Sequence, residues 1–211
     1  MPEQKFNDAV SASMNEVISN KSEIKWTIWT LEKKKFVKPV KNGNAIEDMI
    51  KALNPKEVNY AYFEYKPGMY GLMSVCGEDV GIILRRKFTS LLYKETEEYT
   101  KGRVNFTLMS AADEDTPTME DIEKASAKAT TEYYLVDGQK TKRMNLEELR
   151  DYAANNSTSD AKIENISSSS SSSNTNNTTQ KNDTAEVEAK EKAEAEAKEK
   201  ARAEAEAKEK Q

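Results

Sequence analysis

Cys76 and a few charged clusters are the residues of this chain whose types could do chemistry. The chain has 211 residues, with one cysteine and no histidine. Without histidine, Ser-His and Cys-His nucleophilic schemes and His-ligated zinc or haem sites are excluded, and one cysteine cannot build a Cys-rich metal site. We therefore predict no enzymatic activity and no cofactor. Cys76 is interpreted as a small core residue.

The acidic run at 113–115, Asp-Glu-Asp, is the best candidate for cation binding. It lacks the spaced ligands and the distal glutamate of a calcium-binding loop. We interpret it as a turn that enters the next helix, where Thr118 and Asp121 have the spacing of a capping box. The sequence also contains no glycine-rich phosphate-binding loop. These residues therefore predict no metal site.

A predicted long helix, residues 80–99, carries the most informative surface. At 100° per residue one stripe must face the sheet, and it consists of Leu84, Phe88, Leu91, Leu92, Glu95 and Tyr99. The opposite face consists of Ile82, Ile83, Arg86, Thr89, Ser90 and Tyr93, flanked by Arg85 and Lys87. Aliphatic, tyrosine and cationic side chains together are typical of a protein-binding patch. Alternatively, Ile82 and Ile83 belong to the preceding loop and fill the core, which leaves ordinary surface arginine and lysine.

Hydrophobic periodicity predicts the elements that position this helix. Other helices are predicted at 6–18, at 46–53 and from Thr118 onwards. Strands are predicted at 24–31, 36–40, 58–65, 70–76, 103–110 and 132–136. The residues between the third and fourth strands, Lys66-Pro67-Gly68-Met69, indicate a hairpin. The order α-β-β-α-β-β-α-β-α-β predicts an α/β (α+β) domain with one central mixed sheet and helices on both faces.

The composition changes along the chain and predicts separate segments. Nearly all the aromatic residues precede Asp137, so the folded domain is predicted at 1–136. Residues 137–154 are predicted as a helical extension that either packs loosely on the domain or serves as an interaction segment. Asn145 and Glu148 have the spacing of a helix cap. The helix that they begin carries Leu146, Leu149 and Tyr152.

The remainder of the chain is low in complexity. Residues 155–184 are rich in serine and asparagine and are predicted to be a disordered linker. Residues 185–211 are almost wholly Ala, Glu and Lys, with Glu-before-Lys pairs at i,i+4 that favour a single solvated helix. The helix lacks an a/d seam, which disfavours a coiled coil and predicts a monomer. It could be a spacer, a site for a partner, or a low-complexity expansion without a role.

The overall charge and hydropathy exclude other classes of function. Lys and Arg number 32 against 37 Asp and Glu, and a net charge of −5 argues against general nucleic-acid binding. No window approaches the roughly 20 apolar residues of a membrane span. The first ten residues, MPEQKFNDAV, lack the apolar stretch of a signal peptide. We therefore expect a cytoplasmic protein, which a single thiol also suits.

Several motifs together resemble the actin-depolymerising-factor homology (ADF-H) domain, and within that family the coactosins. Residues 70–80, Tyr-Gly-Leu-Met-Ser-Val-Cys-Gly-Glu-Asp-Val, end like the W-x-G-E-x-V corner of coactosins, and Arg85-Arg-Lys87 then opens the long helix. The remaining matches are Val104-Asn-Phe-Thr-Leu108, Asp113-Glu-Asp115, Asp121-Ile-Glu-Lys124-Ala125 and Glu132-Tyr-Tyr134. No single motif is decisive. Their order and spacing over residues 3–136 carry the resemblance.

The resemblance implies a cytoskeletal module that binds actin filaments and has no enzymatic activity. In this family the long helix inserts into the cleft between actin subdomains, and a β-hairpin makes a second, filament-specific contact. The actin-binding residues carried over to this chain are Lys66, Met69, Ile82, Arg85, Arg86, Lys87, Tyr93 and Lys94. The expected function is to modulate filament stability or the access of other proteins. If the predicted helix at 185–211 is a site for a partner, the resemblance implies that the partner is another actin regulator.

This chain departs from the coactosin pattern in two places. Its hairpin is short, and Met69 stands where coactosins have a lysine, which affects the filament-side contact. Val75 or Cys76 replaces the corner tryptophan, which we interpret as repacking. Three alternatives stay open: cofilin-like severing or monomer binding, a role on the Arp2/3 complex, and an ADF-H scaffold that has lost actin binding.

A basic patch lies on the predicted hairpin of the strands 24–31 and 36–40. It consists of the run 33–35 (Lys-Lys-Lys) with Lys38 and Lys41. Lysines on a sheet edge discourage pairing with a further strand, so a solvated edge is one interpretation. A contact with a phosphoinositide or with actin is the alternative.

Overall fold

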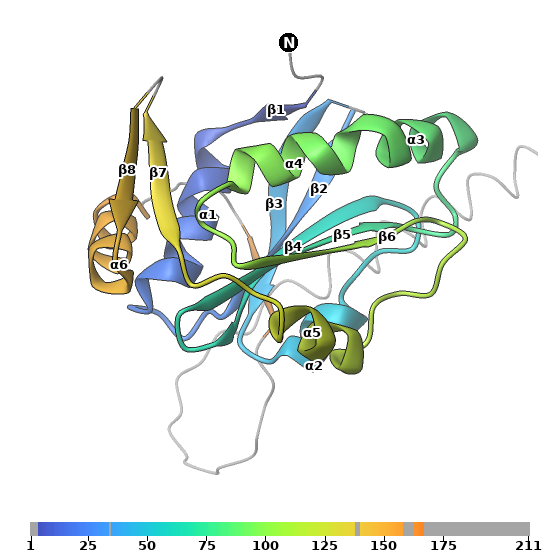
Figure 1. Ribbon diagram of the computed structural model, residues 1–211. Helices are drawn as coiled ribbons and strands as arrows, with labels where there is room; N and C mark the ends of the chain where they lie inside the picture. The colour runs from blue at the N-terminus through green and yellow to red at the C-terminus, as the bar shows by residue number, and fades with distance from the viewer. Residues whose placement is uncertain (1–3, 34, 138–139, 158–162, 167–211) are drawn as a thin grey trace, which may run out of the picture. The chain divides into compact units, whose positions relative to one another are not determined.

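A computed structural model of the protein describes residues 4–33, 35–137, 140–157 and 163–166. These residues form a mixed sheet with helices on both faces, so the predicted α+β fold is confirmed (Figure 1). The helices are α1 (Asp8–Ser19), α2 (Ile46–Lys51), α3 (Ile82–Lys87), the π-helical η1 (Phe88–Leu92), α4 (Tyr93–Thr100), α5 (Met119–Ser126) and α6 (Leu146–Asn155). The strands are β1 (Lys5–Phe6), β2 (Trp26–Glu32), β3 (Phe36–Gly43), β4 (Val58–Lys66), β5 (Met69–Cys76), β6 (Phe106–Ser110), β7 (Tyr133–Asp137), β8 (Lys140–Met144) and β9 (Glu164–Ile166).

The order of the strands fixes where the long helix lies. The main sheet runs β1-β3-β2-β4-β5-β6, and β9 pairs with β3. The predicted hairpin is confirmed as β4 and β5, which are antiparallel. Strand β6 lies parallel to β5, and parallel neighbours need a long crossover connection. That connection is the helix α3-η1-α4, which therefore begins at the carboxyl end of β5 and crosses one face of the sheet.

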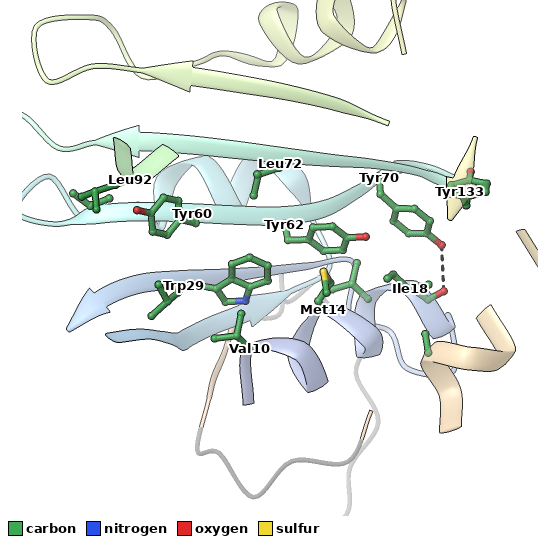
Figure 2. Close-up of a cluster of buried hydrophobic side chains, with 14 of the residues drawn as sticks. Val10, Met14, Ile18, Trp29, Tyr60, Tyr62, Tyr70, Leu72, Leu92 and Tyr133 are labelled. Carbon is green, nitrogen blue, oxygen red and sulfur yellow. Dashed lines mark hydrogen bonds between the residues drawn. The ribbon is translucent and has the colours of Figure 1, made fainter. Parts of the chain in front are cut away.

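Each face of the sheet has its own hydrophobic core, because successive side chains of β2 point to opposite faces. Trp29 belongs to the core that also contains residues of α1, η1 and α6, and its Nε1 donates to Ser13 Oγ at 2.9 Å. Trp26 packs on the other face against α2 and α5. Figure 2 shows the first core, in which tyrosines from β4 and β5 meet apolar residues of α1. The predicted strand covered on both sides is confirmed as β2, but it begins at Trp26, and Ile24 packs in the first core instead of on the face of Trp26.

The last predicted strand, 132–136, does not join the main sheet. It forms β7, which pairs antiparallel with β8, a strand that the sequence did not predict. Tyr133 is buried in the first core, and its hydroxyl donates to the backbone carbonyl of Gly68. This contact ties β7 to the β4–β5 turn. Strand β8 was missed because Thr141, Lys142 and Arg143 are all exposed, so no alternation of apolar residues marks it.

Helix α6 packs more closely than the expected loose extension. Its predicted cap is present: Glu148 N donates to Asn145 Oδ1 at 2.9 Å, and Asn145 N donates to Glu148 Oε2 at 2.9 Å. Leu149 and Ala153 are fully buried in the first core, where α6 lies against α1. We therefore propose that the folding unit extends through α6, beyond the predicted boundary at residue 136.

The outer edge of β3 is covered at both of its ends. Strand β1 pairs with it in parallel at Phe36 and Val37, and β9 pairs with it at residues 41–43. Residues 164–166 fall in the segment expected to be a linker, but they form β9. Lys38 Nζ lies 3.1 Å from Glu32, and Lys41 Nζ donates to the Ala52 carbonyl at 3.1 Å, so these two lysines of the basic patch have local partners.

Several sequence predictions lie outside the described residues. They include most of the predicted linker and the whole predicted helix at 185–211. Within the part of the chain that the structure describes, no helix has both the length and the apolar character needed to cross a bilayer.

Candidate protein-binding surface

Ile82 and Ile83, in the first turn of α3, are the most exposed large hydrophobic side chains of the described residues, at 64% and 66% exposure. The chain reaches this point through Val80, which is 3% exposed, and then Gly81, the extended N-cap residue. Val80 is therefore the last buried residue before the helix, which begins at Ile82. The alternative in which the two isoleucines fill the core is wrong. They are free to bury apolar area against a partner.

The three cations that follow have different roles. Arg85 is half-buried: its Nε donates to the Val80 carbonyl at 2.6 Å, and its Nη2 donates to the Glu78 carbonyl. It therefore fixes the corner between β5 and α3. Arg86 is exposed, whereas Lys87 is half-buried. We call Ile82, Ile83 and Arg86 the Ile-Arg face, because these three side chains are exposed together at the start of the helix.

The π-helical segment changes the surface downstream of this face. The buried residues of the helix are Phe88, Leu92, Thr96 and Thr100, four residues apart. A π-turn shifts the phase of the residues that follow it relative to a regular α-helix. Tyr93, which a regular wheel places on the exposed face, is half-buried in the first core, with its ring centroid 6.3 Å from that of Phe88. Lys94 is exposed beside it, with Nζ 5.8 Å from the Tyr93 ring centroid.

The other predicted contact is the β4–β5 turn, residues 66–69. Lys66 is exposed, with Nζ 5.1 Å from the Tyr65 ring centroid, and Met69 is half-buried. Gly68 has a φ of 75°, which favours glycine. Its N–H donates to Glu64 Oε1 at 2.9 Å. Side chains from outside the turn thus hold both its amide and, through Tyr133, its carbonyl.

The structure does not bring the two predicted contacts together. Helix α3, which carries the Ile-Arg face, follows the carboxyl end of β5, and the β4–β5 turn lies at the amino end of β5 (Figure 1). Strand β5 has 8 residues, which at about 3.4 Å per residue puts its ends about 24 Å apart. A partner that uses both contacts must therefore span the length of the sheet.

Gln4 is a residue beside the helix that sequence reasoning missed. It is 2% exposed; its N–H donates to Glu95 Oε2 at 2.9 Å, and its Nε2 donates to the Leu92 carbonyl at 2.5 Å. Its Oε1 accepts from the Tyr60 hydroxyl at 2.7 Å. The segment before α1 is therefore fixed against α4. A single polar residue outside any periodic segment gives no pattern from which this could be predicted.

Cys76 does not have the surroundings of a reactive thiol. It is 2% exposed, as expected for a core residue, and burial raises the pKa of its thiol. The acidic run at 113–115 is exposed, and Glu114 Oε2 accepts from Ala111 N at 2.7 Å within its own turn. The capping box of Thr118 and Asp121 follows, as predicted. Among the described residues, no three acidic or cysteine side chains gather closely enough to hold a metal ion.

Comparisons with known proteins identify a family. The family model of cofilin/tropomyosin-type actin-binding proteins matches residues 3–125. A solved structure of coactosin from Entamoeba histolytica is similar, at 18% identity over 60% of this chain and 96% of that chain, with a TM-score of 0.51. Human coactosin-like protein is 19% identical over 60% of this chain and 99% of that chain, with a TM-score of 0.47. The cofilin homology domain of the yeast actin-binding protein ABP1P is 17% identical over 57% of this chain and 95% of that chain, with a TM-score of 0.49. No curated protein matches the sequence.

Proposed function

The chain belongs to the family of cofilin/tropomyosin-type actin-binding proteins, and from this we propose that it is a coactosin-like regulator that binds actin filaments. It acts by binding and not by catalysis. Its place is then the cytoplasm and the actin cytoskeleton.

The observation that carries the proposal is the Ile-Arg face. Two isoleucines, 64% and 66% exposed, stand beside an exposed arginine at the start of a helix. Fully burying an isoleucine is worth about 1.5–3 kcal/mol, so covering these two would contribute roughly 2–4 kcal/mol to binding. Arginine is enriched among the residues that dominate interface energetics. The face therefore fits an apolar site on actin with an acidic group at its rim.

The β4–β5 turn is the proposed second contact, and it is filament-specific. Lys66 is the exposed cation there, while Met69 is half-buried. Because the turn and the Ile-Arg face lie beyond opposite ends of β5, which are about 24 Å apart, the two contacts can reach different actin subunits or different parts of one subunit. The turn is short, so most of the affinity resides in the helix. This favours side binding without severing.

Monomer binding is the second candidate, and the shortness of the same turn favours it. A protein that binds through the Ile-Arg face alone has no need of a filament. Measuring affinity for monomeric and filamentous actin side by side separates the two. A filament-binding protein has a higher affinity for filaments than for monomers. This preference for filaments should fall when Lys66 is replaced by alanine.

Charge reversal on the helix tests the proposal. Arg86→Glu should weaken co-sedimentation of the full chain with actin filaments at least tenfold, because the face would then repel the acidic rim of its site. The melting temperature should hardly change, since exposed substitutions typically cost within about 0.5 kcal/mol. Raising the salt concentration should weaken the wild type in the same direction.

Lys101→Glu is the matched control. Lys101 is the C-cap residue of α4, at the other end of the long helix from Arg86, and its side chain is 52% exposed. This variant makes the same change in net charge away from the Ile-Arg face, so it should bind like the wild type. Equal affinity of Arg86→Glu and wild type would remove α3 as the interface.

A further inference from the structure

Glu64, in β4, is a buried carboxylate with two cationic partners. Its side chain is 4% exposed; Lys25 Nζ lies 2.7 Å from Oε2, and Arg150 Nη2 lies 3.2 Å from Oε1. A buried charge is costly unless it is paired and hydrogen-bonded. Lys25 precedes β2 and Arg150 lies in α6. Three segments that are distant in the sequence are thus joined at one carboxylate.

The same carboxylate holds the β4–β5 turn. Gly68 N donates to Glu64 Oε1 at 2.9 Å, which is the oxygen that Arg150 also contacts. A Cβ on Gly68 would lie 2.5 Å from Leu146 Cδ2, so the first residue of α6 packs directly on the turn. The Tyr133 hydroxyl donates to the Gly68 carbonyl. Three of the side chains that surround the turn or its carboxylate therefore come from the segment 133–150.

We propose that Arg150 is a positioning residue for the second actin contact: it orients Glu64, Glu64 holds the amide of Gly68, and the turn that carries Lys66 and Met69 is thereby pre-organised for binding. This inference rests on the proposed function. It assigns to α6 a role in binding, although Arg150 itself, with 28% of its side chain exposed, lies behind the turn and not on it.

Loss of Arg150 is expected to release the Gly68 amide because Glu64 has a second cationic partner, Lys25. Without Arg150, the carboxylate keeps Lys25, whose side chain is 32% exposed and which lies near water. The carboxylate can then turn towards Lys25 and solvent and release the Gly68 amide. The turn would become mobile, and a mobile loop must be ordered before it can bind, which weakens affinity. The contacts of the Ile-Arg face would be unchanged.

Amide exchange at Gly68 tests the clamp without actin. In the full chain, Arg150→Met should speed exchange of this amide about tenfold or more. The matched control is Arg143→Met, which removes an exposed arginine of β8 that pairs with Glu132. Arg143→Met should leave the exchange at Gly68 unchanged. Exchange at the wild-type rate in Arg150→Met would overturn the proposal.

A double-mutant cycle with filaments tests the consequence. Lys66→Ala should weaken filament binding by roughly threefold or more in the wild type, and by a much smaller factor in Arg150→Met, because the turn is no longer positioned. A residue that only stabilised the fold would leave the Lys66→Ala effect unchanged. The same loss in both backgrounds would therefore contradict the positioning role.

Two further results keep the test decisive. If Arg150→Met does not fold, Arg150→Lys keeps the charge but loses the planar fork of arginine, and it should speed Gly68 exchange by a smaller factor. Wild-type exchange in that variant would overturn the proposal. If the wild-type chain does not bind filaments at all, the proposed function fails, and the exchange rate at Gly68 still decides whether Arg150 holds the turn.

Discussion

Two adjacent arginines, Arg85 and Arg86, show how burial assigns different roles to the same residue type. Arg85 is half-buried and donates to the carbonyls of Glu78 and Val80, so it stabilises the corner between β5 and α3. Arg86 projects to solvent at the start of the helix. Only Arg86 therefore combines with the two isoleucines into a surface that a partner can cover. Charge counting along the sequence would have treated the two residues alike.

The buried tyrosines predict how stability depends on pH. Burial raises the pKa of Tyr70 from its ordinary value of 10.0 to about 12, and burial also raises the pKa of Tyr62. Between pH 10 and 12 the folded protein therefore holds a proton on Tyr70 that the unfolded chain has lost. Its contribution to stability is complete below pH 10 and is lost as pH rises through about 12.

Urea unfolding at pH 9 to 12 checks this prediction. The free energy of unfolding should fall across that range, and Tyr70→Phe should make the fall shallower. Tyr152→Phe, at a position that is 38% exposed, is the control and should keep the wild-type slope. If the two variants gave the same slope, the Tyr70 hydroxyl would not be the buried group that we describe.

At the scale of elements, the sequence predicted what local patterns encode. The β4–β5 hairpin and the caps of α5 and α6 depend on residues within a few positions of each other, and all are present. Strands β1 and β9 were missed, because each is short and is defined by its pairing with β3, far away in the sequence. No local pattern marks such a pairing.

In the candidate site, too, the sequence predicted features that depend on local patterns and missed those that depend on distant contacts. The helical wheel identified the face with Ile82, Ile83 and Arg86, but it could not decide whether the two isoleucines were exposed, because that depends on where the helix begins. It misplaced Tyr93, because the π-helical segment shifts the phase after Phe88. The clamp on Gly68 was beyond sequence reasoning, since Glu64 and Arg150 are 86 positions apart.

Helix α6 leads to a prediction about truncation. A chain ending at residue 136 loses β8 and α6, exposes the cavity filled by Leu149 and Ala153, and leaves the buried Glu64 without Arg150. Burying a leucine is worth about 1.5–3 kcal/mol, and the loss of Arg150 adds a further cost, although Lys25 still pairs with Glu64. Domains are stable by only about 5–15 kcal/mol. The 1–136 fragment should therefore fail to show a cooperative melt.

Thermal melting of two fragments, followed by circular dichroism, tests whether cooperative unfolding requires α6. The 1–166 fragment keeps both α6 and β9 and should melt cooperatively near the temperature of the full chain. If 1–136 melted at that same temperature, α6 would be a dispensable extension, as the sequence first suggested, and the clamp on Gly68 would not matter for folding.

In the molecule as a whole, the residues that stabilise the fold are different from those that form the proposed binding surface. Two cores, one on each face of the sheet, bury the large aromatic residues. The crossover from β5 to β6 leaves the first turn of α3 beyond these cores, with its isoleucines exposed. Neighbouring apolar residues that are this exposed contribute little to folding and are typical of a protein-binding site. Under the proposed function, the partner at this site is actin.

Replacing these isoleucines tests this account most directly. Ile82→Ser/Ile83→Ser and the control Met109→Ser, at a position in β6 that is 41% exposed, would be compared with the wild type by co-sedimentation with actin filaments and by thermal melting. We predict that the double variant loses at least tenfold in affinity, about 1.4 kcal/mol, and melts like the wild type, while Met109→Ser binds normally. Wild-type binding by a folded double variant would contradict the claim that this face binds actin.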